Sequence, residues 1–505
     1  MALFYNRVEE AKNNLKVPVF NSGRPAHSKY NPEREAQNFL PQAQNFSFTI
    51  ILGAGGGYHI QSLLERNPSS KIIAVENSLE DLDFLKTNIP CVSELFRDGR
   101  VIFCAAARPN DLEKAIVNNY LPAYYGDLQI AALRPWAQED ESLCQSVMER
   151  IKGCLKKVSA DYSVQARFGG LWQKNIFCNL QTLKKAQEAP RQEIKVDTSK
   201  IAAIIAAGPS LDQSLKTLEE RREKYFVIAT DTGYKILKRR NIKVDAAVSI
   251  DAQTLSAEHF NAPFDKDTIF VLDLAANHSI ANFVYNKGGK IIFSNGGHPL
   301  ITLAGLCCEN PFARLQSGGG TVTMAALDFA KNCGFSDIEI FGADFAYSQG
   351  KPYARGSYLD DLYKKDESRV HNSQSAYARL MFRTPLQKNA AGFLQNEVLL
   401  SYQNSLEEFL GKENFCRKGF DYHCKLSCGQ NKKILSQNKM DFDKFKASLK
   451  SVLVEIENSD ELLPQLSALL PYMAFCRNKA GANKISTKEA KKLALERILL
   501  YNSRI

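Results

Sequence analysis

The stretch Lys200-Ile-Ala-Ala-Ile-Ile-Ala-Ala-Gly-Pro-Ser-Leu-Asp212 joins an unbroken apolar run to a turn. An apolar run of this kind is typical of a parallel strand that is buried on both faces. Gly208 then predicts a tight turn, and Pro209 suits the first position of a helix. Ser210 can place its hydroxyl beside the free N–H groups of that helix. Because a helix start attracts anions, Gly208, Pro209 and Ser210 predict a phosphate-binding turn.

A second glycine-rich turn lies further along the same segment and precedes another helical pattern. It holds more glycine than a packed turn requires, and a close approach of backbone to ligand explains this. A simple flexible turn is the alternative. We therefore predict a second set of ligand contacts, formed by Ser317, Gly318, Gly319, Gly320 and Thr321.

Acidic residues follow neighbouring predicted strands of this segment. Asp231 comes directly after the strand predicted at 225–230, and Asp251 comes directly after the strand predicted at 246–250. Side chains at the carboxyl ends of parallel strands line the ligand crevice of such sheets. We therefore expect both carboxylates to contact a bound nucleotide or sugar, although aspartate at these positions also caps helices.

The loop after the strand predicted at 337–342 carries the candidate catalytic residues. Tyr347 and Tyr353 each offer a phenol hydroxyl, which can stabilise a leaving phosphate without a metal ion. A surface hairpin with two packed tyrosines is the alternative interpretation. Asp344, at the start of the loop, and His371, soon after it, are the candidate general bases.

A third glycine turn, Gly53-Ala-Gly-Gly-Gly57, lies near the N-terminus and is followed by Glu76. The pattern resembles the cofactor turn of S-adenosylmethionine-dependent methyltransferases, in which an acidic residue holds the ribose. No methyltransfer motif follows it. A Rossmann-like scaffold whose ligand is lost or unknown is therefore the preferred interpretation, and a working cofactor site is the alternative.

Composition narrows the class of protein. The chain has 505 residues, of which 44% are hydrophobic, and a net charge of +10. These values are ordinary for a soluble, well-cored protein. The sequence shows no secretory leader, no apolar segment of membrane-spanning length and no basic run with interleaved aromatics. We expect a cytoplasmic protein with no membrane span, no nucleic-acid partner and no metal site.

Strand and helix patterns alternate in two places and predict an α/β fold with two Rossmann-like units and a helical C-terminal domain. Residues 1–45 are expected to have little regular structure. The predicted domains are an N-terminal Rossmann-like domain at 1–140, a helical connector at 141–197, a larger nucleotide-sugar-binding catalytic domain at 198–400 and a helical domain at 401–505.

Together these motifs resemble the motility-associated factor (Maf) glycosyltransferases, whose central domain is similar to the 6-hydroxymethylpterin diphosphokinase MptE-like proteins. The resemblance rests on four stretches: Phe168-Gly-x-x-Trp172-x-x-Asn175, Ala207-Gly-Pro-Ser-Leu211, Gly318-Gly-Gly-Thr-Val322 and Gly342-Ala-Asp-Phe345. The central unit also looks like the fold of certain bacterial sialyltransferases. Tyr347 and Tyr353 match the two tyrosines that those enzymes place on the donor phosphate, whereas Ala206 stands where their turn has its first glycine.

The resemblance implies transfer of a nonulosonic acid of the pseudaminic or legionaminic type from a CMP-linked donor to Ser or Thr of flagellin. We expect an inverting, metal-independent reaction in the cytoplasm that requires no cofactor. Mg²⁺ is possible but not indicated; Asp360-Asp361 is a possible metal pair, and a solvated helix start is the preferred interpretation of it. Two other functions stay open. One is an ATP-dependent diphosphokinase that acts on a pterin-like alcohol, and the other is a non-catalytic flagellin-binding assembly factor.

Overall fold

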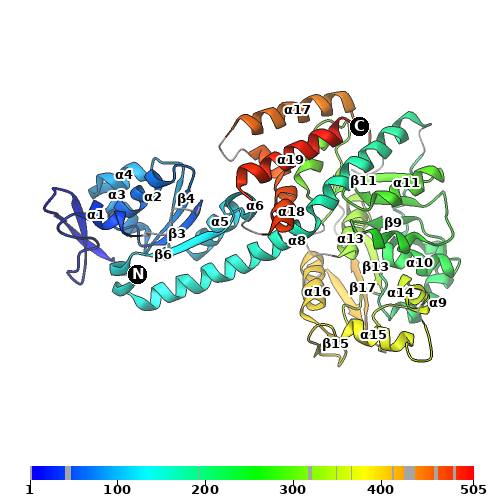
Figure 1. Ribbon diagram of the computed structural model, residues 1–505. Helices are drawn as coiled ribbons and strands as arrows, with labels where there is room; N and C mark the ends of the chain where they lie inside the picture. Colours follow the sequence, from blue (N-terminus) through cyan, green and yellow to red (C-terminus); the bar gives the residue numbers. More distant parts are fainter. Residues whose placement is uncertain are drawn as a thin grey trace. The chain divides into compact units, whose positions relative to one another are not determined.

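The computed structural model divides the chain into two compact units (Figure 1). Unit 1 contains Met1–Gly170 and Val452–Arg497, and unit 2 contains Leu171–Ser451 and Ile498–Ile505. Residues 401–505, which the sequence predicted as one helical domain, are therefore shared between the two units. The structure describes residues 3–39, 47–190, 193–316, 321–348, 350–365, 367–411, 414–425, 438–459, 464–481 and 485–505.

Unit 1 is built on a parallel sheet with the strand order β5-β4-β3-β6. Its four strands are β3 (Phe48–Leu52), β4 (Lys71–Glu76), β5 (Val101–Ala105) and β6 (Leu128–Ala132). The helices of this part include α2 (Tyr58–Arg66), α3 (Leu79–Asn88) and α5 (Pro109–Asn119). Every residue of β3 is buried, as its apolar sequence predicts for an inner parallel strand. The predicted Rossmann-like unit is confirmed.

The first residues of unit 1 are more ordered than the sequence suggested. β1 (Tyr5–Glu10) and β2 (Lys16–Phe20) form an antiparallel ribbon, and α1 (Pro32–Gln37) follows it. The expectation of little regular structure was wrong here. Its basis was the number of prolines, but Pro18 is accommodated inside β2 in a two-stranded ribbon, where one edge of each strand needs no partner.

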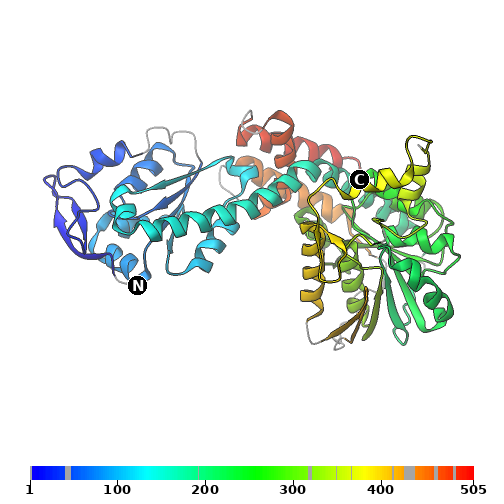
Figure 2. The same ribbon diagram turned by 90° about the horizontal axis from the view of Figure 1, so that it is seen from below.

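Unit 2 contains a nine-stranded sheet in the order β12-β11-β10-β9-β8-β7-β13-β17-β16. The parallel strands are β7 (Ile201–Ile205), β8 (Tyr225–Thr230), β9 (Ala246–Ser249), β10 (Ile269–Asp273), β11 (Lys290–Asn295), β12 (Ala313–Arg314) and β13 (Asp337–Phe341). β16 (Phe415–Lys418) and β17 (Asp421–Lys425) add an antiparallel edge. This hairpin was not predicted, because the sequence indicated a helix-rich segment, with helices from Glu397 to Leu410 and from Phe442 onward and no element assigned between them. Figure 2 shows the sheet edge-on among its helices.

The strand order reverses direction between β7 and β13. The chain adds β8 to β11 on one side of β7, and β13 then pairs with the other side of β7. The segment that follows β13 returns to the turn after β7, where Ala354 N donates to the carbonyl of Ala207 at 2.9 Å and Arg355 N donates to Asp212 Oδ1 at 3.0 Å. In doubly wound sheets the ligand crevice lies at this reversal, outside the carboxyl ends of the strands.

Trp136 packs closely on the glycine turn that follows β3, and a substitution at Gly53 tests this packing. Gly53 has φ +92°, and a Cβ placed on it would lie 2.6 Å from Trp136. Gly23 has a similar φ of +83° but no atom within 4 Å of such a Cβ. We expect Gly23→Ala to cost about 1 kcal/mol of backbone strain and Gly53→Ala about 3 kcal/mol or more. Urea unfolding of both variants measures the difference, and equal losses would contradict the packing of Trp136 on this turn.

Candidate active site

The predicted phosphate turn lies at the reversal of the sheet, against the turn that follows β13. The backbone N–H of Gly208 donates to the carbonyl of Gly342 at 2.8 Å. A Cβ on Gly208 would lie 2.4 Å from a carboxylate oxygen of Asp344. Only glycine fits between these two turns. A second part of the chain therefore approaches Gly208 closely, which the sequence did not predict.

Asp344 fills the start of the helix that was predicted to bind phosphate. That helix is α9 (Leu211–Glu220), and the backbone N–H of Ser210 donates to Asp344 Oδ2 at 2.9 Å, while the Ser210 hydroxyl donates to Oδ1. Ser210 makes no capping bond to α9. The expectation of a Ser210 hydroxyl held beside free N–H groups was wrong, because a carboxylate of the chain itself satisfies this anion position. Donor contacts by Gly208, Pro209 and Ser210 stay a prediction.

Burial raises the pKa of Asp344 to about 6, against the hydrogen bonds from Ser210, and Asp421 acts in the same direction as burial. Asp344 is 2% exposed. Its two oxygens accept bonds from Ser210, and Ser348 approaches Oδ2 at 3.5 Å. These contacts fit a residue that holds the two turns together, and its predicted role as a base stays untested.

A second group of side chains lies within electrostatic reach of one another at the same edge. We call it the strand-end cluster, and it consists of Asp231, Asp251, Tyr347, Tyr353, Tyr358 and Arg383. Burial raises the pKa of Tyr353, and the phenols of Tyr358 and Tyr347 and the carboxylate of Asp231 raise it further. The rings of Tyr353 and Tyr358 lie 6.1 Å apart. Tyr347 and Asp231 therefore lie close enough to Tyr353 to raise its pKa, and the predicted roles of these three residues stay predictions.

Asp231 is the most deeply buried carboxylate of the cluster. It is the first residue of α10 (Asp231–Arg239) and is 2% exposed. Burial raises its pKa to about 7 and the charge of Asp251 adds to this, while bonds from Thr232 N at 2.7 Å and Ser249 Oγ at 3.0 Å oppose the shift. Near neutral pH this carboxyl is therefore protonated in part of the molecules, and a protonated carboxyl can donate a hydrogen bond.

Three residues at this edge of the sheet were not predicted from the sequence. Arg383, which follows α15 (Ser373–Met381), lowers the pKa of Tyr347 against the larger effect of burial and supplies the cluster's positive charge. Tyr358 begins α14 (Tyr358–Lys365). Asp273 ends β10, and burial raises its pKa to about 6. Asp273 comes directly after an apolar run, and this position could have identified it as a residue at a strand end. Arg383 lies far from any strand end in the sequence, so no local pattern could have identified it.

Two asparagines of α8 (Glu141–Glu188) hold the loops beside the cluster. Asn175 Nδ2 donates to the carbonyls of Ala252 at 3.1 Å and Ala275 at 3.0 Å. Asn179 Nδ2 donates to those of Leu274 and Ala276, both at 2.9 Å. One turn of helix therefore fixes the loop after Asp251 to the loop after β10. This explains why the Phe168–Asn175 motif accompanies the sheet motifs.

The remaining predicted site residues lie away from the strand-end cluster or outside the residues that the structure describes. His371 is exposed in the turn before α15, and nothing in its surroundings assigns it a catalytic role. Thr321 caps α13 (Val322–Cys333), where its hydroxyl oxygen accepts from Thr323 N at 3.0 Å. Ser317, Gly318, Gly319 and Gly320 lie outside the described residues, so the structure does not test their donor contacts.

The glycine turn of unit 1 is filled by side chains of its own unit. Glu76, the candidate ribose ligand, is fully buried and accepts bonds from Tyr5 Oη at 3.1 Å, Ala54 N at 3.0 Å and the indole N–H of Trp136. The backbone N–H of Gly56 donates to His27 at 2.8 Å. The groups that would hold an adenosine are thus used internally, which favours the interpretation as a scaffold.

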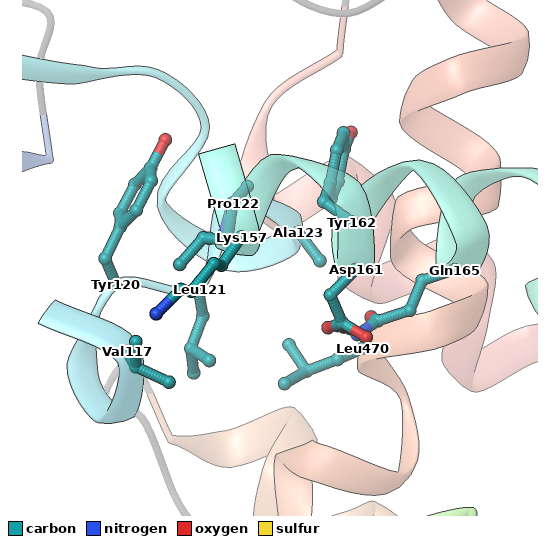
Figure 3. A pocket seen from close by; sticks show the side chains of 11 residues that line it. Val117, Tyr120, Leu121, Pro122, Ala123, Lys157, Asp161, Tyr162, Gln165 and Leu470 are labelled. Atoms are coloured by element: carbon teal, nitrogen blue, oxygen red, sulfur yellow. Dashed lines mark hydrogen bonds between the residues drawn. The ribbon is translucent and has the colours of Figure 1, made fainter. Parts of the chain in front are cut away.

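Unit 1 also contains a cavity of about 220 Å³ between the end of α5, the turn of α6 (Pro122–Tyr125) and α8 (Figure 3). Val117, Leu121 and Leu470 provide apolar walls, and Lys157 and Asp161 of α8 stand at its rim. The residues predicted to be catalytic or donor-binding all belong to unit 2. This cavity therefore contains none of the chemistry that the sequence indicated.

The part of the chain that the structure describes contains neither a metal-ligand group nor a helix that could span a membrane. Within it, no three His, Cys, Asp or Glu side chains are grouped so that they could share a metal ion. Its helices are each too short or too polar to cross a bilayer.

Comparisons with known proteins agree with this architecture. A sequence profile described as 6-hydroxymethylpterin diphosphokinase MptE-like matches residues 174–350. The structure of a MAf glycosyltransferase from Magnetospirillum magneticum AMB-1 superimposes with a TM-score of 0.54 at 11% identity, over 100% of this chain and 87% of that one. The predicted resemblance to the Maf glycosyltransferases is thus confirmed for the fold, with an MptE-like central domain.

Two uncharacterized proteins of Treponema pallidum (strain Nichols) are related in sequence. One is 34% identical over 153 residues, which are 30% of this chain and 54% of that protein. The other is 30% identical over 162 residues, which are 32% of this chain and 76% of that protein. The chain therefore spans about half the length of the first relative and most of the second.

The raised pKa values at the sheet edge predict how stability depends on pH. Asp344 titrates near 4 when unfolded and at about 6 when folded. The native state therefore binds more protons between these values, and stability falls as the pH rises through them. Asp231 and Asp273 act in the same direction. These carboxyls make the melting temperature fall from pH 4.5 to pH 7.5, whereas burial lowers the pKa of His59, His259 and His298 and so reduces this fall.

Asp344→Asn is the matched variant, because an amide oxygen can accept from Ser210 N while its NH₂ group donates to the Ser210 hydroxyl. We expect this variant to fold and to show a shallower fall of melting temperature over the same range. A slope equal to that of the wild type would show that Asp344 is ionised throughout.

Proposed function

We propose that this chain, which belongs to one family with the second Treponema pallidum relative, is a glycosyltransferase whose donor binds at the strand-end cluster of unit 2. Its reaction would move a nonulosonic acid from a CMP-linked donor to Ser or Thr of flagellin, in the cytoplasm. The observation that carries the proposal is the convergence of Tyr347 and Tyr353 with Asp231 at the reversal of the sheet. The fold shared with a Maf glycosyltransferase supports the reaction class.

Charge decides which groups would meet which part of the donor. A CMP-linked nonulosonic acid is a dianion, with one phosphodiester and one sugar carboxylate. The cluster offers Arg383 as a cation and two carboxyls, of which Asp231 has a pKa of about 7. Protonated Asp231 would donate to a ribose or phosphate oxygen, whereas a side-chain oxygen of Asp251 would accept from a hydroxyl. Partial protonation reduces the repulsion that two full negative charges would impose.

The tyrosines would act on the leaving group. Cleavage of the bond between the anomeric carbon and the phosphate oxygen leaves CMP with the electron pair, so negative charge grows on that phosphate. Burial keeps Tyr347 and Tyr353 as neutral phenols, because it raises the pKa of both. Two O–H donors aimed at the growing charge stabilise it by a few kcal/mol. A hydroxyl of the acceptor attacks the opposite face and gives inversion.

The diphosphokinase function named by the matching profile is the second candidate. It would require ATP and Mg²⁺ at the same edge. The profile match alone favours it, so the CMP-linked donor is preferred.

Intact-mass analysis of flagellin tests the proposal directly. Flagellin is co-expressed with this chain and with enzymes that supply a CMP-linked nonulosonic acid. We expect mass increments that equal whole nonulosonic acid residues. The control omits the chain and leaves flagellin unmodified. Flagellin of unchanged mass in the presence of both the chain and the donor would contradict the proposed transfer.

The tyrosine roles predict a loss of turnover without a loss of fold. Tyr353→Phe removes one O–H donor and leaves the ring packed against Tyr358. We expect kcat for CMP release to fall by about 10²–10³, with a melting temperature close to that of the wild type. Tyr285→Phe, on α11 (His278–Asn286), is the matched control. Equal turnover in the two variants would remove Tyr353 from the mechanism.

A further inference from the structure

Unit 1 holds a second cavity, of about 400 Å³, beside the one in Figure 3. We call it the arginine cavity, because Arg477 lies in its lining, and we call the cavity of Figure 3 the apolar cavity. The two share one wall, formed by Tyr120, Pro122, Val158 and Tyr162. They therefore adjoin, and one ligand can reach from one into the other. All the lining residues belong to unit 1, whereas the strand-end cluster belongs to unit 2.

Arg477 is a buried cation whose hydrogen bonds are made to neutral oxygens. It lies on α18 (Leu470–Ala480) and is 4% exposed. Its guanidinium donates, at 2.8 to 3.2 Å, to the carbonyls of Ala123, Tyr124 and Ile485 and to the hydroxyl of Thr487. A guanidinium has five N–H groups. Among the described residues, the fifth N–H, which is on Nη1, therefore has no acceptor.

The charge of Arg477 has little compensation inside the protein. Burial lowers the pKa of Arg477, and Tyr162, Asp127 and Tyr120 act in the opposite direction. Asp127 is exposed, and an ion pair that faces solvent is worth little. Buried charges in proteins are normally paired. A cation in the wall of a cavity with so little compensation indicates an anionic ligand.

Two further features of the arginine cavity favour an oxygen ligand beside Nη1. Gly126 has φ +74°, and a Cβ placed on it would lie 3.7 Å from Nη1. Glycine therefore leaves uncovered the side of Nη1 that a side chain here would contact. The Tyr162 hydroxyl makes no hydrogen bond to a described residue. Because burial raises the pKa of Tyr162, against the effect of Arg477, the phenol keeps its proton and supplies a second donor.

The apolar cavity determines which kind of anion fits. Val117, Leu121 and Leu470 form its walls (Figure 3). Its volume of about 220 Å³ exceeds the roughly 150 Å³ of an apolar cavity that holds benzene. A group of phenyl size therefore fits. Lys157 stands at the rim with its side chain 75% exposed, so the described lining adds no second buried cation for a doubly charged phosphate ester.

We propose that the two cavities bind a small carboxylic acid with an apolar group of about phenyl size. The carboxylate accepts from Arg477 Nη1 and Tyr162 Oη, and the apolar group occupies the apolar cavity. A carboxylate carries one charge, which matches that of Arg477, and hydrogen bonds between charged partners are stronger than neutral ones. The arginine cavity alone lies in the range of about 300–1,000 Å³ that is typical of small-molecule sites. The carboxyl end of a polypeptide shares this chemistry, and a peptide therefore serves as a competing probe.

Calorimetric titration of the full-length protein with hydrocinnamate tests the proposal. Propanoate lacks the ring and hydrocinnamyl alcohol lacks the charge, so we expect each to bind at least tenfold more weakly. Tyr162→Phe removes one donor and keeps the ring that lines both cavities, and we expect it to weaken hydrocinnamate binding about tenfold. Tyr30→Phe is the matched control, because Tyr30 is a 68% exposed tyrosine of unit 1 outside both cavities. Its affinity should equal that of the wild type.

Absence of hydrocinnamate binding at millimolar concentration, or equal binding by Tyr162→Phe and Tyr30→Phe, would overturn the proposal. Displacement of hydrocinnamate by CMP would place it at the proposed donor site instead and would also overturn it. A peptide that ends in phenylalanine and binds more tightly than hydrocinnamate, but only with a free carboxyl end, would assign the cavities to a polypeptide and overturn the small acid. Binding of hydrocinnamate does not depend on sugar transfer, so failure of the proposed function leaves this inference intact.

Discussion

The contact between Asp344 and the turn at Gly208 joins the two halves of the candidate site. β7 and β13 are neighbours in the sheet although they lie far apart in the sequence. The carboxylate of Asp344 binds Ser210 through the space that a Cβ on Gly208 would occupy. This contact holds the loop that carries Tyr347 and Tyr353 against the carboxyl end of the sheet. The strand-end cluster forms only while these two turns stay together.

Negative charge is the dominant electrostatic feature of this edge. Asp231, Asp273 and Asp344 follow different strands, and burial raises the pKa of each. A raised pKa lets a carboxyl stay near an anionic donor, because its protonated form is neutral and can donate. In the proposed function, the phenols, protonated Asp231 and Arg383 of the cluster would contact the donor phosphate. Binding of an anionic ligand should depend on pH in the range where Asp231 titrates.

Buried strands and the residues directly after them were predictable from the sequence, because a long apolar run has few other uses. Asp231 and Asp251 were found in this way. The partner of Ser210 was not predictable, since nothing local in the sequence indicates that Asp344 reaches the start of α9. The hairpin of β16 and β17 was missed because two short strands carry a weak periodic signal inside a helix-rich segment. The clamp by Asn175 and Asn179 depends on tertiary contacts to loops beyond residue 250.

Calorimetric titration of the full-length protein with CMP, at pH 6 and at pH 8, tests most directly whether a cytidylate binds at this edge. The account predicts binding at both pH values, with higher affinity at pH 6, where Asp231 is largely protonated. It also predicts no comparable binding of ATP with Mg²⁺. Absence of CMP binding, or tighter binding of ATP with Mg²⁺ than of CMP, would contradict the account.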